Sequence, residues 1–280
     1  MSIFANAKVN LYLDIVSKRS DGYHNIETIF QEITLCDILD IEVTDSGFQL
    51  TCNIPELEND DNLLKKAYDM LKPSFEEEFG VQVHLEKLVP FGAGLGGGSS
   101  DCANFMLALK TISGADISDA ELVKIGAKLG ADVPFFLQGG TAIGRGIGDE
   151  LEKIPVNFGF PMLLVNPGIH VSTKDAYSGC VLGGGSDKFT EILSGLKSGD
   201  VVRVAENLFN GFEQTVFQKF PEIQELRDLI KGSGALGAAM SGSGSTCFGI
   251  FENTDSARNA AERISKNKKY FTKVVNSVSR

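Results

Sequence analysis

The stretch best suited to chemistry is PFGAGLGGGSS, the glycine-rich run Pro90–Ser100. It follows a segment that alternates like a strand, 81–88, and it opens a segment with a helical pattern, 99–112. Glycines let the backbone approach a ligand closely, so that successive N–H groups can converge on phosphate oxygens. The helix start adds a partial positive charge, and Ser99 and Ser100 add hydroxyls for phosphate or Mg²⁺. The loop therefore predicts a site for a phosphorylated ligand.

Two other interpretations of this loop are a flexible turn and a dinucleotide site. Gly92, Gly94 and Gly97 satisfy the G-x-G-x-x-G pattern, which is weak by itself. A dinucleotide fold places a strand that ends in an acidic residue about 20 positions later. Here the region reads ISGADISDAELVKIGAKL and favours a helix, and G-x-x-x-x-G-K-[ST] does not occur. The loop therefore belongs to another class of nucleotide site, and a dinucleotide oxidoreductase stays a distant alternative.

The composition is that of a globular protein with an acidic surface. The 280 residues carry 37 acidic and 26 basic side chains, a formal net charge of −11. This charge opposes attraction to nucleic acid or to anionic lipid. No run reaches the length of a membrane span, no leader pattern is present, and the five cysteines show no C-x-x-C pair. We expect a cytoplasmic chain with reduced thiols, no metal-ligand cluster, and neither nucleic acid nor membrane as a partner.

The order of patterns indicates a mixed α+β protein in two parts. Strands are expected at 7–16, 33–43, 48–52, 81–88, 160–166, 246–251 and 273–278. Helices are expected at 61–71, 99–112, 118–129, 200–209, 222–231 and 255–265, the third opened by a capping box of Ser118 and Glu121. Ser178–Ser186 is expected to be a mobile surface loop. Because strands and helices do not alternate strictly, α+β is favoured, and we place a domain boundary near Pro155.

Three motifs together resemble the GHMP kinases, which phosphorylate galactose, homoserine, mevalonate and related alcohols. PFGAGLGGGSS is similar to their P-x-G-x-G-L-G-x-S-S loop, Ala7–Leu11 to their A-K-[IV]-N-L segment, and Met240–Gly244 to their C-terminal glycine motif. The motifs span almost the whole chain in the family's order. The resemblance implies a two-domain α+β fold: an N-terminal mixed α/β domain over 1–155, with a ribosomal-protein-like βαβ unit, that binds ATP, and a C-terminal ferredoxin-like α+β domain over 156–280.

Two further segments narrow the expected substrate. Lys18–Gln31 (KRSDGYHNIETIFQ) and Gly130–Phe136 (GADVPFF) are similar to the branch of the family that acts on cytidine-diphosphate methylerythritol in the non-mevalonate isoprenoid pathway. The resemblance implies transfer of a phosphoryl group from ATP, with Mg²⁺, to the 2-hydroxyl of that alcohol. A kinase for homoserine, mevalonate or a sugar, and a nucleotide-binding protein without catalysis, are the alternatives.

The resemblance also implies catalytic roles for two residues. Asp132 would accept the proton of the attacking hydroxyl, and Lys8 would orient that carboxylate and stabilise charge on the phosphoryl group. Phosphoryl transfer depends mainly on positioning and electrostatics, so this pair with a phosphate cradle and Mg²⁺ would suffice. From spacing alone, Lys8 could instead be a solvated strand lysine, and Asp132 a helix cap ahead of Pro134.

The remaining site residues follow from the same resemblance. The nucleotide is expected to contact Pro90, Phe91, Gly92, Ala93, Gly94, Leu95, Gly96, Gly97, Gly98, Ser99 and Ser100, with Asn62 and Lys87 bordering adenine. Tyr23 is expected to stack on cytosine and Tyr177 on its other face, although a Tyr177 packed in the core is an equal alternative. Asn10, His24, Phe30 and Thr173 would line the rest of the substrate pocket, and for His24 an ordinary loop histidine is the alternative.

Overall fold

The computed structural model describes residues 1–267 and 269–279 and divides them into two compact units. Both units contain residues of the two long strands β1 (Ser2–Lys18) and β2 (His24–Thr44). The first unit comprises 1–7, 35–91 and 96–139, and the second comprises 8–34, 92–95 and 140–280. A single cut near Pro155 does not reproduce this division, so the boundary near Pro155 stays a prediction.

The sheet of the first unit is built on the second half of β2. β4 (Gly80–Glu86) pairs with it in antiparallel orientation and with β3 (Phe48–Cys52) in parallel orientation. Along β4 the side chains of Val81, Val83 and Leu85 are buried, while the polar residues between them are exposed. This alternation of period two gives the sheet one apolar face.

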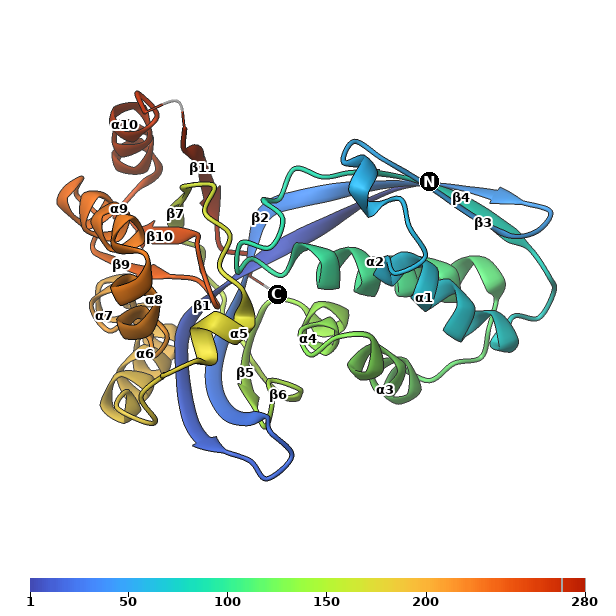
Figure 1. Ribbon diagram of the computed structural model, residues 1–280, viewed down its shortest axis with the longest axis horizontal. Coiled ribbons are helices and arrows are strands. Elements are labelled where there is room, and N and C mark those ends of the chain that lie inside the picture. The colour runs from blue at the N-terminus through green and yellow to red at the C-terminus, as the bar shows by residue number, and fades with distance from the viewer. Residues whose placement is uncertain (268, 280) are drawn as a thin grey trace. The chain divides into compact units, whose positions relative to one another are not determined.

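Helices cover that apolar face (Figure 1). They are α1 (Leu63–Leu71), α2 (Gly97–Ser113), α3 (Asp119–Leu129) and α4 (Val133–Gln138), with single 3₁₀ turns at Pro55–Leu57 and Lys72–Ser74. The predicted capping box of Ser118 and Glu121 is present at the start of α3. The longest of these helices, α2, begins directly at the glycine loop, so the loop is held between β4 and a helix N-terminus.

The second unit contains a four-stranded antiparallel sheet of ferredoxin-like topology. Its strands are β7 (Pro161–Asn166), β9 (Gly237–Met240), β10 (Cys247–Ile250) and β11 (Phe271–Asn276), in the order β11-β7-β10-β9. The helices α9 (Pro221–Gly232) and α10 (Thr254–Ile264) connect β7 to β9 and β10 to β11. The resulting βαββαβ order confirms the predicted ferredoxin-like part.

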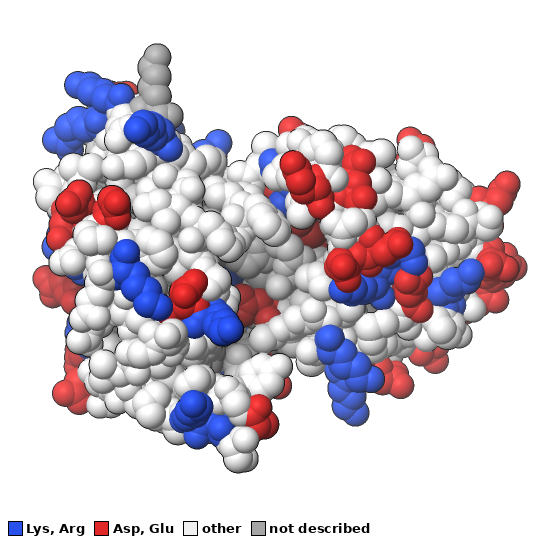
Figure 2. Space-filling model, viewed as in Figure 1, with Lys and Arg blue, Asp and Glu red and all other residues white. Residues whose placement is uncertain are grey.

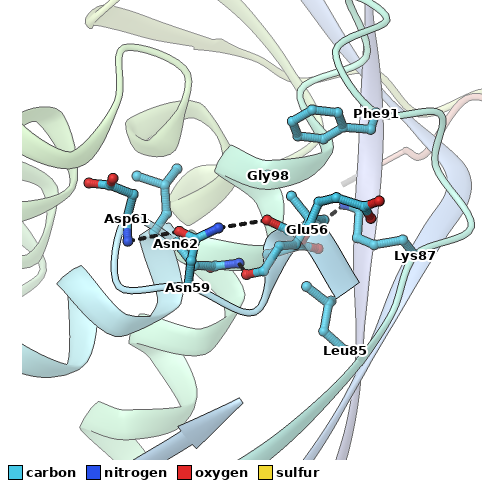
Figure 3. Close-up of a pocket in the computed structure, with 11 residues that line it drawn as sticks. Glu56, Asn59, Asp61, Asn62, Leu85, Lys87, Phe91 and Gly98 are labelled. Atoms are coloured by element: carbon cyan, nitrogen blue, oxygen red, sulfur yellow. Dashed lines mark hydrogen bonds and ion pairs between the residues drawn. The ribbon is translucent and has the colours of Figure 1, made fainter. Parts of the chain in front are cut away.

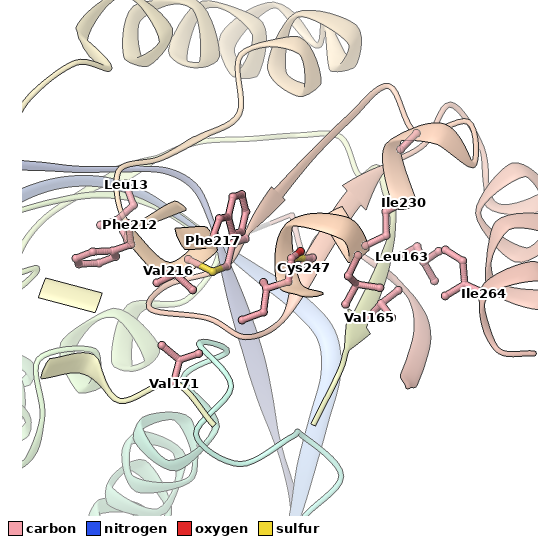
Figure 4. Packing of buried hydrophobic residues seen from close by; sticks show 14 of the residues in the cluster. Leu13, Leu163, Val165, Val171, Phe212, Val216, Phe217, Ile230, Cys247 and Ile264 are labelled. Carbon is pink, nitrogen blue, oxygen red and sulfur yellow. The ribbon is translucent and has the colours of Figure 1, made fainter. Parts of the chain in front are cut away.

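The core of the second unit lies between this sheet and its helices (Figure 4). α9 buries Ile223, Leu226 and Ile230, whose spacing of three and four residues gives a helix one apolar stripe. The stripe packs with Leu163 and Val165 of β7 in one hydrophobic cluster. A fully buried side chain of this kind contributes roughly 1.5–3 kcal/mol to folding.

Several elements of the second unit were not predicted or were predicted with wrong bounds. These are β5 (Thr141–Arg145), β6 (Glu150–Ile154), α5 (Thr173–Tyr177), α6 (Ser186–Ser198), α7 (Val201–Glu206), β8 (Phe209–Asn210) and α8 (Glu213–Lys219). The helix predicted over 200–209 is wrong at its end, because Phe209 pairs in parallel with Tyr12 of β1. The predicted loop 178–186 is tied to β1, since the amides of Gly183 and Gly185 donate to the Ile15 carbonyl (2.8 Å) and Asp14 carboxylate (3.1 Å).

Candidate active site

In the second unit, the middle of the glycine loop packs against the C-terminal glycine motif. The hydroxyl of Ser241 donates to the carbonyl of Gly94 (2.9 Å), and the amide of Thr246 donates to the carbonyl of Ala93 (3.3 Å). The amide of Lys8 donates to the carbonyl of Leu95 (3.0 Å). All three sequence motifs therefore meet at residues 92–95.

Gly94 has no room for a side chain. Its φ is +79°, and a Cβ atom would lie 2.0 Å from the carbonyl oxygen of Ser241. We expect Gly94→Ala to lower the free energy of unfolding by at least about 2 kcal/mol, because strain in the left-handed region adds to the clash. Gly98→Ala is the matched control, since a Cβ there meets nothing within 4 Å. Urea denaturation of both variants tests this, and equal stabilities would contradict it.

In the first unit, the end of the loop forms the start of α2. Gly96, at φ 71°, occupies the N-cap position of that helix. The Ser100 side chain is fully buried, and its hydroxyl donates to the carbonyl of Asn6 (2.6 Å). We expected both serine hydroxyls to be open to phosphate or Mg²⁺, but Ser100 instead holds α2 on β1. Ser99 is half-buried, and its Oγ lies 3.5 Å from the Cβ position of Gly130, in the GADVPFF segment.

Asp132 stands at the N-cap position of α4 in the first unit. Its backbone is helical (φ −85°, ψ −11°), and its side chain accepts no capping hydrogen bond. The amide of Val133 is satisfied by the carbonyl of Gly130 (3.1 Å), and Pro134 has no amide hydrogen to cap. The carboxylate of Asp132 is therefore not used as a cap, although it stands at the cap position.

Four of the residues predicted to bind the nucleotide line one cavity of about 400 Å³ in the first unit (Figure 3). They are Asn62, Lys87, Phe91 and Gly98, and the other lining residues are Glu56, Leu57, Asn59, Asp61, Leu63, Leu85 and Asp101. Asn62 caps α1, accepting from the amide of Leu64 (2.9 Å) and donating to the carbonyl of Leu57 (2.9 Å). Phe91 is 65% exposed, so its ring is open to a planar ligand.

A buried ion triad lies at one side of this cavity. The ammonium of Lys87 is paired with Asp37 and with Asp101 (2.8 Å), and the Lys87 side chain is 2% exposed. The other oxygen of Asp37 accepts from the amides of Leu88 (2.6 Å) and Val89 (2.8 Å). The triad therefore fixes the backbone that leads from β4 into the glycine loop, and the Lys87 ammonium is committed to the triad.

One carboxylate of the triad, Asp101, has a raised pKa. Burial raises the pKa of Asp101 to about 7, and the charge of Asp37 also raises it, against the lowering effect of Lys87. One oxygen of Asp101, Oδ1, has no hydrogen-bond partner among the described residues, whereas both oxygens of Asp37 are used. For Lys87, burial lowers the pKa, but Asp101 and Asp37 outweigh it and raise the pKa.

The raised pKa of Asp101 predicts a pH-dependent stability. The folded pKa of Asp101 lies above the ordinary value of 3.8, so its contribution is fully present below about pH 4 and is lost as the pH rises toward 7. Between pH 5 and pH 8, we expect the free energy of unfolding of the wild type to fall relative to Asp101→Asn by on the order of 2 kcal/mol. Urea denaturation at both pH values measures the difference, and a constant difference would contradict it.

In the second unit, Lys8, Asn10 and Phe30 form a buried cluster. The ammonium of Lys8 donates to Oδ1 of Asn10 (2.7 Å) and lies 5.4 Å from the centre of the Phe30 ring. The amide of Asn10 donates to the hydroxyl of Thr28 (2.8 Å), which donates to the carbonyl of Tyr12 (2.6 Å). Lys8 is 4% exposed. It is therefore an ordered, buried cation and not a solvated strand lysine.

The aromatic residues expected to hold cytosine lie in the second unit. His24 stacks on Tyr177, with ring centres 4.7 Å apart and planes at 17°. Tyr177 also makes an edge contact with Phe212 (4.7 Å). Tyr23, the residue expected to face Tyr177 across the base, is 63% exposed. The structure therefore brings His24, and not Tyr23, against Tyr177, which is half-buried at the edge of the core.

Sequence reasoning assigned no role to several residues of these clusters. Asp37 and Asp101 belong to no pattern that marks a buried ion pair, although Asp101 directly follows the glycine loop. Thr28 lies in the Lys18–Gln31 segment that resembles the family, and that was a usable signal. His170 lies with its Nδ1 3.4 Å from the Cβ position of Gly92. Thr173, expected in the substrate pocket, is exposed at the first position of α5.

Two further observations concern the charges on the surface and the apolar content of the helices. Acidic and basic side chains are interspersed on the face shown in Figure 2, and no broad area of Lys and Arg alone covers that face of the described residues. Within residues 1–267 and 269–279, no helix has the length and apolar content needed to cross a membrane.

Comparison with protein families defines the class. The description "GHMP kinases N terminal domain" matches residues 62–140, and "GHMP kinases C terminal" matches residues 192–269. The first range holds the glycine loop, Asp132 and most residues of the first-unit cavity, and the second holds α9 and α10 of the ferredoxin-like part. The fold and the glycine motifs are those of a GHMP kinase.

Individual relatives narrow the class. The 4-diphosphocytidyl-2-C-methyl-D-erythritol kinase of Citrifermentans bemidjiense is 39% identical and covers 99% of both chains. The enzyme of that name from Thermoanaerobacter pseudethanolicus is 38% identical over 94% of this chain and 92% of its own. A crystal structure of 4-(cytidine 5'-diphospho)-2C-methyl-D-erythritol kinase superimposes with a TM-score of 0.84 at 34% identity, covering 98% of this chain and 99% of that one. The chain therefore belongs to this family of GHMP kinases, and it is an ATP-dependent kinase of small molecules.

More distant structures share the fold alone. A homoserine kinase from Cytophaga hutchinsonii gives a TM-score of 0.77 at 19% identity and covers all of this chain. The predicted two-part α+β fold is thereby confirmed.

Proposed function

We propose that the chain phosphorylates the 2-hydroxyl of 4-(cytidine 5'-diphospho)-2-C-methyl-D-erythritol, a step of the non-mevalonate isoprenoid pathway. The observation that carries this proposal is the 39% identity over nearly the full length with relatives named for that kinase. The buried cluster of Lys8, Asn10 and Phe30 supports it, because all three lie beside motifs shared with that family. We place the reaction in the cytoplasm, with neither nucleic acid nor membrane as a partner.

In the proposed reaction, Asp132 acts as the general base. The substrate hydroxyl gives its proton to the Asp132 carboxylate, and its oxygen forms a bond to the γ-phosphorus of ATP. The bond between that phosphorus and the bridging oxygen breaks, and its electron pair leaves with ADP. Lys8 stabilises the charge on the transferred group. Supporting this, Asp132 lies in the GADVPFF segment shared with the family, and the Lys8 ammonium is fixed by Asn10 at 2.7 Å.

The proposal includes Mg²⁺. When bound with ATP, the ion neutralises charge on the phosphate oxygens. Mg²⁺ takes hard oxygen ligands and is usually held by one or two carboxylates and by substrate phosphates. The hydroxyl of Ser99, on the first turn of α2, is an oxygen donor of this kind. It fits the ion, and we propose it as a protein ligand that acts together with the phosphates of ATP.

We further propose that the first-unit cavity receives the adenine of ATP and that the aromatic residues of the second unit hold cytosine. Phe91, at 65% exposure, offers a ring face to the purine. Tyr23 and Tyr177 would enclose the pyrimidine, which requires cytosine to replace His24 on the Tyr177 ring or to stack beside it. Base stacking on an aromatic side chain is worth roughly 1–3 kcal/mol, enough to favour the exchange.

A substrate panel tests the proposed function. Purified protein is mixed with Mg-ATP and with the cytidine-diphosphate alcohol, the same alcohol phosphate without cytidine, mevalonate, homoserine or galactose, and ADP release is followed. We expect turnover with the first compound and at least about a tenfold lower kcat/KM without cytidine. Turnover of only mevalonate, homoserine or galactose would agree with a kinase but would contradict the proposed substrate. No turnover of any compound, with ATP still bound, would contradict the proposed catalytic activity.

A further inference from the structure

A second cavity, of about 430 Å³, lies entirely within the second unit. Its walls come from the loop after α5 and from α6, β8, α8, α9 and β9 (Figure 1). The lining residues are Val181, Gly183, Gly184, Lys188, Leu208, Phe209, Asn210, Gly211, Glu213, Gln214, Arg227 and Ala238. None of them belongs to the glycine motifs or to the residues proposed for ATP and the alcohol. The volume falls within the range of about 300–1,000 Å³ that is usual for small-molecule sites.

Arg227 is the first of two cations in this cavity. Its Nη1 lies 3.5 Å from Oε2 of Glu213, and its guanidinium lies 5.2 Å from the centre of the Phe217 ring. Its Nε lies 2.7 Å from Oδ1 of Asp228, but is not aligned to donate a hydrogen bond to it. Arg227 is therefore oriented by its neighbours while its hydrogen-bonding capacity is only partly used.

Glu213 is the carboxylate of the cavity, and its oxygens already have partners. Oε1 accepts from the amide of Met240 (2.8 Å), and Oε2 faces Arg227. Burial raises the pKa of Glu213. Asp14 is a second carboxylate nearby, with Oδ1 3.5 Å from the Cβ position of Gly211, but it does not line the cavity. Glu213 thus orients Arg227 and does not neutralise the whole site.

Lys188, on α6, is the second cation. Its ammonium lies 5.3 Å from the centre of the Phe209 ring, and within the described part of the chain no carboxylate oxygen pairs with it. The side chains of Val181, Leu208 and Phe209 form an apolar part of the wall. The wall of the cavity therefore includes two cations and an apolar surface.

We propose that this cavity binds a small organic phosphate, with the phosphate between Arg227 and Lys188 and its carbon part on Leu208 and Phe209. The planar guanidinium matches phosphate oxygens with two parallel hydrogen bonds, and an ammonium adds a compact charge. An apolar molecule would cover Arg227 without using the hydrogen-bonding capacity that its neighbours leave open, which is costly. A free cation would be repelled by both. A phosphate ester with a short carbon chain satisfies the polar and the apolar part of the cavity together.

Calorimetric titration tests this proposal on the full chain, with saturating ADP so that the nucleotide site is occupied. The probes are n-butyl phosphate, inorganic phosphate and 1-butanol. We expect butyl phosphate to bind once per chain and more tightly than inorganic phosphate, and butanol not to bind. We expect Lys188→Gln to weaken butyl phosphate binding at least about tenfold, as the loss of a charge-assisted contact requires. Lys197→Gln, on the exposed end of the same helix, is the matched control and should bind as the wild type does.

A second variant distinguishes a loss of phosphate binding from a loss of folding. Arg227→Lys keeps the charge but removes the planar fork, so binding should weaken while circular dichroism stays unchanged. Turnover of the cytidine-bearing alcohol should be unchanged in Lys188→Gln. Absence of butyl phosphate binding, equal binding by the wild type and Lys188→Gln, or binding of butanol with the same affinity would each overturn the proposal. Inorganic phosphate binding as tightly as the ester would overturn the role of Leu208 and Phe209.

Discussion

Asp132→Asn should lower kcat by about 10²–10⁴-fold and leave the affinity for ATP within about twofold of the wild type. An amide has nearly the shape of the carboxylate but cannot accept the proton of the substrate hydroxyl. The fold should tolerate the change, because asparagine has nearly the same size and is also favoured at the N-cap position that Asp132 occupies in α4. Steady-state kinetics with the cytidine-bearing alcohol measure kcat, and fluorescence titration measures the binding of ATP.

The control for this variant is Asp116→Asn. Asp116 is an exposed aspartate in the connection between α2 and α3, so the same chemical change there should leave kcat unaltered. Near wild-type turnover in Asp132→Asn would remove Asp132 as the base. A parallel loss of ATP affinity would instead point to a damaged nucleotide site.

Lys8→Met should lower kcat by about 10²–10³-fold, the usual cost of removing one donor that stabilises charge in the transition state. Methionine keeps most of the apolar stem against Phe30, but the contact of the ammonium with Oδ1 of Asn10 (2.7 Å) is lost. Asn10 would then hold an unsatisfied acceptor, so we also expect a loss of about 1–3 kcal/mol in the free energy of unfolding. Kinetics and urea denaturation on the same preparation separate the two effects.

Lys153→Met provides the matched control, because Lys153 is an exposed lysine on the short strand β6. It should change neither turnover nor stability by a measurable amount. If Lys8→Met loses stability and keeps its kcat, Lys8 is a structural residue of the buried cluster and the proposed electrostatic role is wrong.

Local patterns predicted much of the fold. The capping box of Ser118 and Glu121 marked the start of α3, and the alternation around Val81 marked β4, because both signals lie within a few neighbouring residues. The two-residue strand β8 was not predicted, since Phe209 becomes a strand residue only by pairing with Tyr12 of β1. Such pairing depends on a distant segment and leaves no local pattern.

The candidate site was likewise predicted only in part. The glycine loop, the Ala7–Leu11 segment, the C-terminal glycine motif and the GADVPFF segment could be recognised because each is a fixed run of residue types. The stack of His24 on Tyr177 could not be predicted, because the sequence pointed to Tyr23 and did not indicate which of these two neighbouring rings would contact Tyr177. Lys87 was expected to border adenine, and it does line the cavity, but its ammonium is held by two aspartates.

The sequence by itself determined which chemical groups this protein possesses and their order: a phosphate loop, one lysine, one aspartate and an acidic overall charge. The tertiary structure decided which of these groups are open to a ligand. Ser241 meets Gly94 across 147 positions of the chain, and Asp37 meets Lys87 across 50. Burial of a charge is favourable only when a partner from another segment reaches it, so a residue type alone does not specify whether that charge serves a ligand or the fold.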